Sequence, residues 1–334
     1  MTSGKPDFIT SPVRQTDVAR KAGVSTATVS RVLNGSTLVR SEVRSRVEAA
    51  IAELGYLPHE GARSLATRRT RTLGMIIPTL NNAIFAAGVN ALEAEARDQG
   101  HGLVISVSNY DPVQETVLIR QMLERKVDGL ALVGNDRTDE ARDLLRSSGL
   151  RHVAAWTFDQ HGATADIGFD NHAAMEPLVA HLMATGRRRI ALLAGVTADN
   201  DRARARVKGI RHYLSEHGLA LVGSREVRYS IRLAQAAFPD MLAHRPDAII
   251  CGNDVIAYGV LFAAQQAGID VPDDIAVTGF DDLPMSEGLN LTTIAVPAAE
   301  MGRRAANELI RAAEEERAPE SYEMQTTLVR RGTS

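Results

Sequence analysis

The chain has 334 residues, a net charge of −3 and 44% hydrophobic residues, which is enough for two or three domains with sizeable cores. Its single cysteine, Cys251, excludes an internal disulfide and fits a reducing compartment. No apolar run is long enough to span a membrane, and the polar N-terminus lacks the apolar core of a signal peptide. We therefore expect a cytoplasmic protein without a membrane partner.

The charge is divided unevenly along the chain. Residues 1–71 contain 12 of the 38 Lys and Arg residues but only 6 of the 41 Asp and Glu residues, a balance of +6. The remaining residues therefore carry −9. A basic N-terminal segment on an acidic body indicates that only this segment meets a polyanion.

Residues 16–35 predict two short helices joined by a tight turn. Apolar residues recur at helical spacing in both: Val18, Ala19 and Ala22 in the first, Val29, Val32 and Leu33 in the second. Gly23 is suited to end the first helix, and Ser25 can cap the second. A third helix over residues 41–54 would complete a small core. This continuation favours a helix-turn-helix that reads DNA over an ordinary helical hairpin.

From residue 72 the pattern changes to alternating strands and amphipathic helices. The expected strands cover residues 73–77, 102–107, 129–133, 190–193, 248–251 and 275–278. Asp111 and Pro112 are typical of a helix start, and Gly268 of a helix end. Continuous apolar strands with crossover helices predict parallel sheets that are covered on both faces, the α/β class.

Catalytic chemistry has little support in the sequence. No phosphate-binding loop, dinucleotide fingerprint, nucleophile elbow or zinc-protease motif is present. The nine histidines form no ligand pairs near an acid, so we expect no metal and no cofactor. The neighbouring carboxylates Asp281 and Asp282 could suggest acid–base work, but adjacent side chains usually diverge. We expect a protein that is not an enzyme.

The N-terminal segment closely resembles the headpiece of the lactose-repressor (LacI/GalR) family. The motifs that carry the resemblance are Asp17-Val-Ala, Ala22-Gly-Val-Ser, Thr28-Val-Ser-Arg-Val-Leu-Asn-Gly35, Gly55-Tyr-Leu-Pro58 and Ala62-Arg-Ser-Leu65. The resemblance continues over nearly the whole remaining chain. It implies an all-α helix-turn-helix headpiece and an α/β effector domain of two doubly wound subdomains, similar to periplasmic sugar-binding proteins.

The resemblance also implies a division of the chain. We expect a DNA-binding headpiece at residues 14–57, a hinge helix and linker at 58–71, and an effector-binding and dimerisation domain at 72–334. Within that domain, the N-subdomain would take residues 72–164 and 298–318, and the C-subdomain residues 165–296 and 320–331. Because no heptad repeat follows Arg331, a homodimer without a tetramer-forming tail is expected.

The residues implied to contact DNA are Ser25, Thr26, Ala27, Thr28, Ser30, Arg31, Asn34, Arg40, Tyr56, Ala62, Arg63 and Leu65. Thr26, Ala27 and Arg31 should lie nearest to base edges in the major groove, where an arginine can bond bidentately to guanine. Leu65 resembles the residue that wedges into the minor groove, and we expect the hinge to fold only on DNA. The expected partner is double-stranded DNA with a pseudopalindromic operator.

The residues implied to bind an effector are Phe85, Thr157, Arg206, Tyr229, Asn253 and Asp281. Asn253 could equally be a simple helix cap, and Tyr229 could be core packing. Thr157 and Val296 stand where many members of the family carry acidic and amide side chains, which argues against the best-known galactosides. We interpret residues 200–202 as a solvated loop.

These observations predict a homodimeric transcription factor, a repressor, whose operator affinity depends on a small sugar-like effector. Whether the effector induces or corepresses stays open. The alternative is a cytoplasmic sugar-binding protein without regulatory DNA binding, and an enzyme on a doubly wound scaffold is a more distant one.

Overall fold

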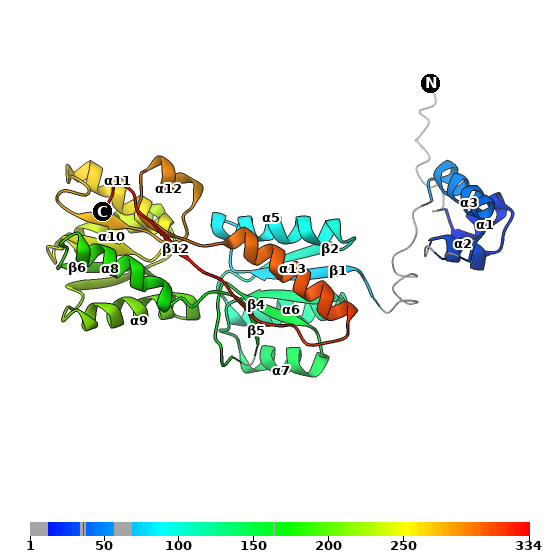
Figure 1. Ribbon diagram of the computed structural model, residues 1–334, viewed down its shortest axis with the longest axis horizontal. Coiled ribbons are helices and arrows are strands. Elements are labelled where there is room, and N and C mark those ends of the chain that lie inside the picture. The colour runs from blue at the N-terminus through cyan, green and yellow to red at the C-terminus, as the bar shows by residue number, and fades with distance from the viewer. Residues whose placement is uncertain (1–12, 34–35, 37, 57–68, 163) are drawn as a thin grey trace, which may run out of the picture. The chain divides into compact units, whose positions relative to one another are not determined.

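The computed structural model describes residues 13–33, 36, 38–56, 69–162 and 164–334. The chain divides into two compact units, Met1–Thr70 and Arg71–Ser334, which we call the headpiece and the body (Figure 1). The predicted hinge helix with Ala62, Arg63 and Leu65 lies outside the described residues, as does Asn34. None of the helices in the described ranges is long and apolar enough to cross a membrane.

The headpiece contains the three helices that the sequence predicts. They are α1 (Gln15–Ala22), α2 (Thr26–Leu33) and α3 (Ser41–Leu54). Gly23 ends α1 with a φ of 65°, a backbone conformation that a side chain disfavours. The Ser25 hydroxyl accepts a hydrogen bond from the Thr28 amide at 3.2 Å, which fixes the start of α2. The core between the helices is built around Val18, Val29 and Val47.

The N-subdomain of the body is built on a parallel sheet. Its strands are β1 (Thr72–Ile77), β2 (Gly102–Val107), β3 (Gly129–Val133), β4 (His152–Ala155), β5 (Ala165–Gly168) and β11 (Tyr322–Glu323), in the order β11-β5-β4-β3-β1-β2. Along β1, Met75 packs with the core that includes α5 (Ala83–Asp98) and α13 (Ala298–Glu314). Ile76 packs with α6 (Pro112–Glu124) and α7 (Asp139–Ser148). The sheet is therefore covered on both faces, as predicted.

Helices α5 and α13 lie side by side although they are far apart in the sequence (Figure 1). Their backbones approach most closely at Gly88 and Gly302, where a Cβ on Gly302 would overlap the carbonyl oxygen of Gly88. A Cβ on Gly88 would overlap the indole of Trp156. Glycine is required here because only a residue without a side chain permits this approach.

The C-subdomain is built on a second parallel sheet. Its strands are β6 (Ile190–Gly195), β7 (Gly223–Val227), β8 (Ala248–Cys251) and β9 (Ala276–Thr278), in the order β7-β6-β8-β9. Its helical elements are η1 (Ala173–Met175), α8 (Glu176–Ala184), α9 (Asp201–Glu216), α10 (Ile231–Leu242), α11 (Asp254–Ala267) and α12 (Pro284–Gly288). An antiparallel pair, β10 (Thr293–Ala295) with β12 (Thr327–Val329), lies beside this sheet.

The predicted boundary between the subdomains is wrong by one strand. The sequence analysis assigns residue 165 onward to the C-subdomain, but β5 pairs in parallel with β4, with Val153 opposite Ala165. Likewise β11 pairs with β5, so residues 322–323 belong to the N-subdomain. A strand's membership is decided by its hydrogen-bonded neighbours, which a short apolar run does not reveal.

We predict that Gly302→Ala destabilises the body by about 1–3 kcal/mol, because the added methyl group would force α13 away from α5. Gly288→Ala in α12 is the matched control, since a Cβ there meets nothing within 4 Å. Urea unfolding curves of both variants measure the difference. Equal stability of the two variants would contradict the close packing of α5 on α13.

Candidate DNA-reading helix and ligand cavity

The outer face of α2 is free to contact another molecule. Thr26, Ala27 and Arg31 are exposed, whereas Val29 and Val32 are buried against the other helices. Ser25 and Thr28 lie at the start of the helix with their hydroxyl oxygens 2.9 Å apart. Small side chains and one long cationic side chain therefore share the exposed face of a helix with an apolar back. This arrangement suits insertion into the major groove.

Two other predicted DNA contacts have different surroundings. Arg40 is exposed at the start of α3, where it could reach a phosphate. Tyr56 is only 6% exposed and packs in the headpiece core, and its contact with DNA stays a prediction. Arg44, which the sequence analysis did not single out, donates to the Ser36 carbonyl oxygen at 2.8 Å and holds the segment that follows α2.

A small cavity of about 30 Å³ lies in the body, walled by residues of both subdomains, and it shares four lining residues with an adjoining opening of about 510 Å³. Most of them stand beyond the carboxyl ends of strands, where parallel sheets bind ligands. The N-subdomain contributes Asn82, Ile84, Phe85, Tyr110, Trp156, Phe169 and Asn171. The C-subdomain contributes Asn200, Arg202, Arg206, Tyr229, Asn253, Phe280 and Asp281.

The structure brings five of the six predicted effector residues together in this cavity: Phe85, Arg206, Tyr229, Asn253 and Asp281. Thr157 is not among the lining residues, and its neighbour Trp156 takes that place at the end of β4. Trp156 has a φ of 60°, and its ring packs edge-on against Phe85 with the ring centroids 5.3 Å apart. The positive φ of Trp156, for which the sequence gives no signal, determines that Trp156 and not Thr157 lines the cavity.

The interpretation of residues 200–202 as a solvated loop is wrong. Asn200 and Arg202 are 3% and 8% exposed and both line the cavity. The Asn200 side chain caps α9 through the Ala203 amide and donates to the Tyr229 hydroxyl at 3.2 Å. Tyr110, also missed, stacks at a tilt on Tyr229 with the centroids 5.8 Å apart. Both tyrosines also line the wider opening that adjoins the cavity, so they stand between the two.

Asn253 combines the two roles that the sequence left open. Its side-chain oxygen accepts from the Ile256 amide at 3.0 Å and caps α11. Its side-chain nitrogen is buried next to the Asp281 carboxyl, whose pKa it lowers. The cap fixes the orientation of the amide, so that its N–H groups are available to Asp281 or to a ligand.

Arg206 is held from two sides in the cavity wall. One terminal nitrogen donates to the Asn171 side-chain oxygen at 2.7 Å. The guanidinium lies over the ring of Phe280, 4.5 Å from its centroid, a cation–π contact. Its Nε has no partner among the described residues. The guanidinium is therefore oriented while part of its hydrogen-bonding capacity is unused.

Asp281 is a buried carboxyl group with a strained backbone. Its φ of 117° lies in a region that L residues rarely adopt, and its amide donates to the Ile294 carbonyl oxygen at 2.8 Å. Burial and, after it, the nearby Asp254 carboxylate raise the pKa of Asp281 to about 8, while Arg206 and the side-chain amides of Asn253 and Asn82 oppose the shift. Asp254 is itself buried beneath the cavity and accepts from the hydroxyls of Ser286 and Thr293.

Three polar contacts join the first turn of α9 to the end of β3 and the loop that follows it, and we call them the interlobe clamp. Asp201 accepts from the Asn135 amide at 2.6 Å, and Arg202 donates to the Val133 carbonyl oxygen at 3.0 Å. Arg204 pairs with Asp136 at 2.6 Å. The clamp fixes the two subdomains relative to each other beside the cavity.

The comparisons with known proteins agree with this architecture. Residues 16–59 match the family of bacterial regulatory proteins, lacI family, and residues 179–334 match the periplasmic binding protein-like domain. The HTH-type transcriptional regulator GntR of Pseudomonas aeruginosa is 35% identical over 318 residues, covering 92% of this chain and 90% of that protein. Catabolite control protein A of Staphylococcus epidermidis is 31% identical over 297 residues, covering 86% and 88%.

Among solved structures, the lac repressor dimer bound to operator and the anti-inducer ONPF superposes with a TM-score of 0.87 at 28% identity, over 97% of this chain and 99% of that one. The headpiece and the two-subdomain body thus define a DNA-binding transcriptional regulator rather than an enzyme. The chain belongs to the lacI family of bacterial regulatory proteins. This membership rules against the alternative of a sugar-binding protein without DNA binding.

We predict that Asp281→Asn stabilises the ligand-free protein increasingly as the pH rises. In the wild type the folded state holds a proton on Asp281 that the unfolded state has already lost, so folding stability falls from about pH 4 to about pH 8. The neutral amide removes this loss, so the gain should be smallest near pH 4 and level off above about pH 8.

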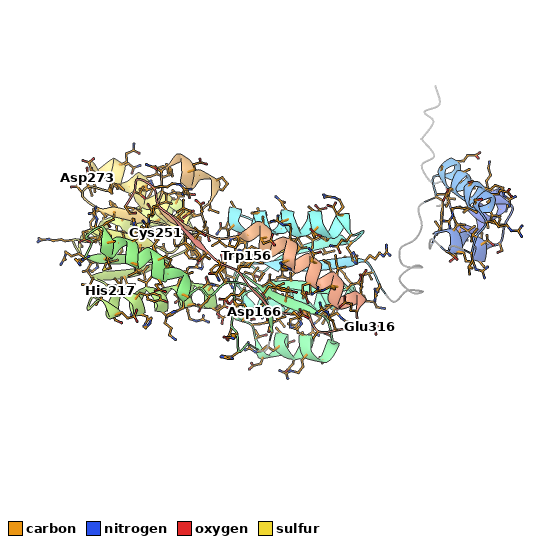
Figure 2. All side chains as sticks on the ribbon, in the orientation of Figure 1. Trp156, Asp166, His217, Cys251, Asp273 and Glu316 are labelled. Carbon is orange, nitrogen blue, oxygen red and sulfur yellow. The ribbon has the colours of Figure 1, made fainter. Side chains whose placement is uncertain are left out.

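Thermal unfolding at a series of pH values measures this profile. Asp273→Asn, which removes an exposed carboxylate at the surface (Figure 2), controls for the loss of one charge. A gain that does not depend on pH would mean that Asp281 is ionised in the folded protein.

Proposed function

We propose that this regulator is a homodimeric repressor whose affinity for a pseudopalindromic operator is controlled by a small polar, sugar-like effector in the body cavity. The observation that carries the proposal is that the cavity walls come from both subdomains. A ligand that contacts both walls favours one arrangement of the subdomains over others, which is the requirement for coupling between two sites.

The polar lining supports a hydroxyl-rich effector. Amide, guanidinium, carboxyl and phenol groups stand around the cavity, next to the aromatic rings of Phe85, Trp156 and Tyr229. Aromatic faces pack against the apolar faces of sugar rings while polar groups bind the hydroxyls. Asp281 and Asn253 are the residues that we propose to bind ligand hydroxyls, with Arg206 beside them.

An exposed apolar surface of the N-subdomain supports dimerisation. The side chains of Leu80, Ile105, Val113 and Val117 are 59%, 40%, 66% and 44% exposed. Ile105 lies on β2, which is the edge strand of its sheet, and the two valines follow on α6. Exposed large apolar side chains on an edge strand and on the helix that follows it are typical of an interface between subunits.

We predict that Arg31→Ala relaxes base preference at one symmetric pair of operator positions, because an exposed arginine on α2 can bond bidentately to guanine. The loss should be about 1–3 kcal/mol on the preferred sequence and small on others. Selection of binding sites from random DNA measures the change in base preference. A shift assay with DNA from the regulator's own upstream region measures the loss of affinity on a natural site.

The control is Arg46→Ala, which removes the same charge from the exposed side of α3. If Arg31→Ala selects the same sequence as the wild type, the proposal that α2 reads bases in the major groove is wrong. A change on one half-site only would contradict the twofold symmetry of the proposed dimer.

We also predict that Arg204→Ala loosens the interlobe clamp and exposes Trp156, the single tryptophan of the chain. The pair with Asp136 is partly exposed and is worth about 0.2–1 kcal/mol, so the ratio of open to closed forms should rise by up to about fivefold. The emission of Trp156 should shift to longer wavelength and be quenched more strongly by acrylamide.

Arg211→Ala is the matched control, because Arg211 is exposed on the same helix and takes no part in the clamp. Asp136→Asn should reproduce the effect of Arg204→Ala, and the double variant should add little. Identical emission spectra for all variants would show that the clamp does not hold the cavity closed.

A further inference from the structure

The walls of the cavity offer hydrogen-bond donors in excess of acceptors. The side-chain oxygens of Asn82, Asn171, Asn200 and Asn253 all accept hydrogen bonds within the protein. Among the lining residues, Trp156 Nε1 and Arg206 Nε are buried and have no hydrogen-bond partner within the described residues, and the Asn253 amide has only the Asp281 carboxyl beside it. These groups are N–H donors, so a ligand that satisfies them must bring acceptors.

The charges on the wall are also unbalanced. Arg202 is paired with Asp201 at 2.8 Å and bonded to a backbone oxygen, so its charge is matched within the clamp. Arg206 forms no ion pair with any residue in the described part of the chain, and its bonded partner Asn171 is a neutral amide. An arginine that is partly buried without a carboxylate partner is costly unless the ligand supplies one.

Asp281 does not cancel this charge in the empty cavity. The raised pKa keeps much of its carboxyl protonated at neutral pH, and a protonated carboxyl both donates and accepts. The cavity then carries one unmatched positive charge at Arg206 and one carboxyl group suited to bind a hydroxyl. Trp156 lies where the two subdomains meet (Figure 2), and it lines the same cavity as Arg206 and Asp281.

From this donor excess and the unpaired guanidinium, we infer that the effector is a small polyhydroxylated monocarboxylate rather than a neutral sugar, with its carboxylate on Arg206. This inference rests on the proposed function, because it names the chemical class of the effector that the cavity takes. The carboxylate accepts from Arg206, and its four lone-pair directions leave capacity for the neighbouring N–H donors. The hydroxyl chain then contacts Asp281 and the aromatic rings.

The test compares molecules that differ only in the charged group. The carboxylates D-gluconate, D-galactonate and D-mannonate are matched with the alcohols D-glucitol, D-galactitol and D-mannitol, in which a hydroxymethyl group replaces the carboxylate. Neutral hexoses and glucose 6-phosphate complete the panel. Binding to the full-length protein is followed by the emission of Trp156 and by calorimetry, and operator binding is measured with each ligand in parallel.

We expect at least one carboxylate to bind tenfold to about a hundredfold more tightly than its matched alcohol and to change operator affinity. Arg206→Met should abolish this preference, and Arg206→Lys should keep part of it because the charge remains. Arg211→Met on the same helix should leave the preference unchanged. Thermal unfolding of each variant checks that it folds.

The other outcomes separate this inference from the function beneath it. If a neutral alcohol or hexose binds as tightly and changes operator affinity, the carboxylate is wrong and the proposed function stands. A preference for the phosphate overturns the monocarboxylate in the same way, and a preference that survives in Arg206→Met overturns the role of Arg206. If none of the panel binds, the inference fails. If ligands bind without changing operator affinity, the proposed coupling fails instead.

Discussion

The arrangement of the two subdomains beside the cavity depends on a buried charge, the guanidinium of Arg202 at the start of α9. It is 8% exposed, and a buried charge must be paired to be tolerated. Asp201 supplies the opposite charge from the same helix, and the Val133 carbonyl oxygen supplies an acceptor from the other subdomain. Gly134, with a φ of 72°, has to be a glycine because a Cβ would overlap that guanidinium. Satisfying Arg202 therefore fixes the loop after β3, the orientation of α9 and one wall of the cavity together.

Residues that line the cavity lower the stability of the ligand-free folded protein. Asp281 combines a φ of 117° with burial and a raised pKa, and each of these features disfavours the empty folded state. The N–H groups of Trp156 and Arg206 that have no partner within the described residues add to the cost. The strands beneath the cavity are apolar and well packed. A strained backbone and a buried carboxyl group on one lining residue are expected at a binding site and not in a structural core.

The regular elements could be predicted from the sequence because their signals are local. Apolar runs, caps such as Asp111 and terminating glycines such as Gly268 predicted the helices that they bound and the strands β1, β2, β3, β6, β8 and β9, whereas these signals did not predict the other six strands in the described residues. The assignment of strands to the two sheets could not be predicted from the sequence, because β5 pairs with β4 through long-range hydrogen bonds. Arg202 and Asn200 were mistaken for a solvated loop because their polarity is local and their burial depends on the other subdomain. Trp156 was missed in favour of Thr157 for a similar reason, since a backbone turn decides which residue faces inward.

The strength of the interlobe clamp bears on how the regulator can respond. Its outermost pair joins Arg204, 47% exposed, to Asp136, 29% exposed, and such a pair contributes about 0–1 kcal/mol. Coupling between an effector and a second site commonly amounts to about 1–3 kcal/mol, which exceeds this contribution. A ligand that contacts both walls can therefore outweigh the contribution of that pair, whether it favours a closer or a wider arrangement of the two subdomains. A fully buried clamp would hold one arrangement too firmly for a small molecule to change. The combination of one buried, satisfied arginine with a weak outer pair gives the two subdomains a defined arrangement that a ligand can still shift.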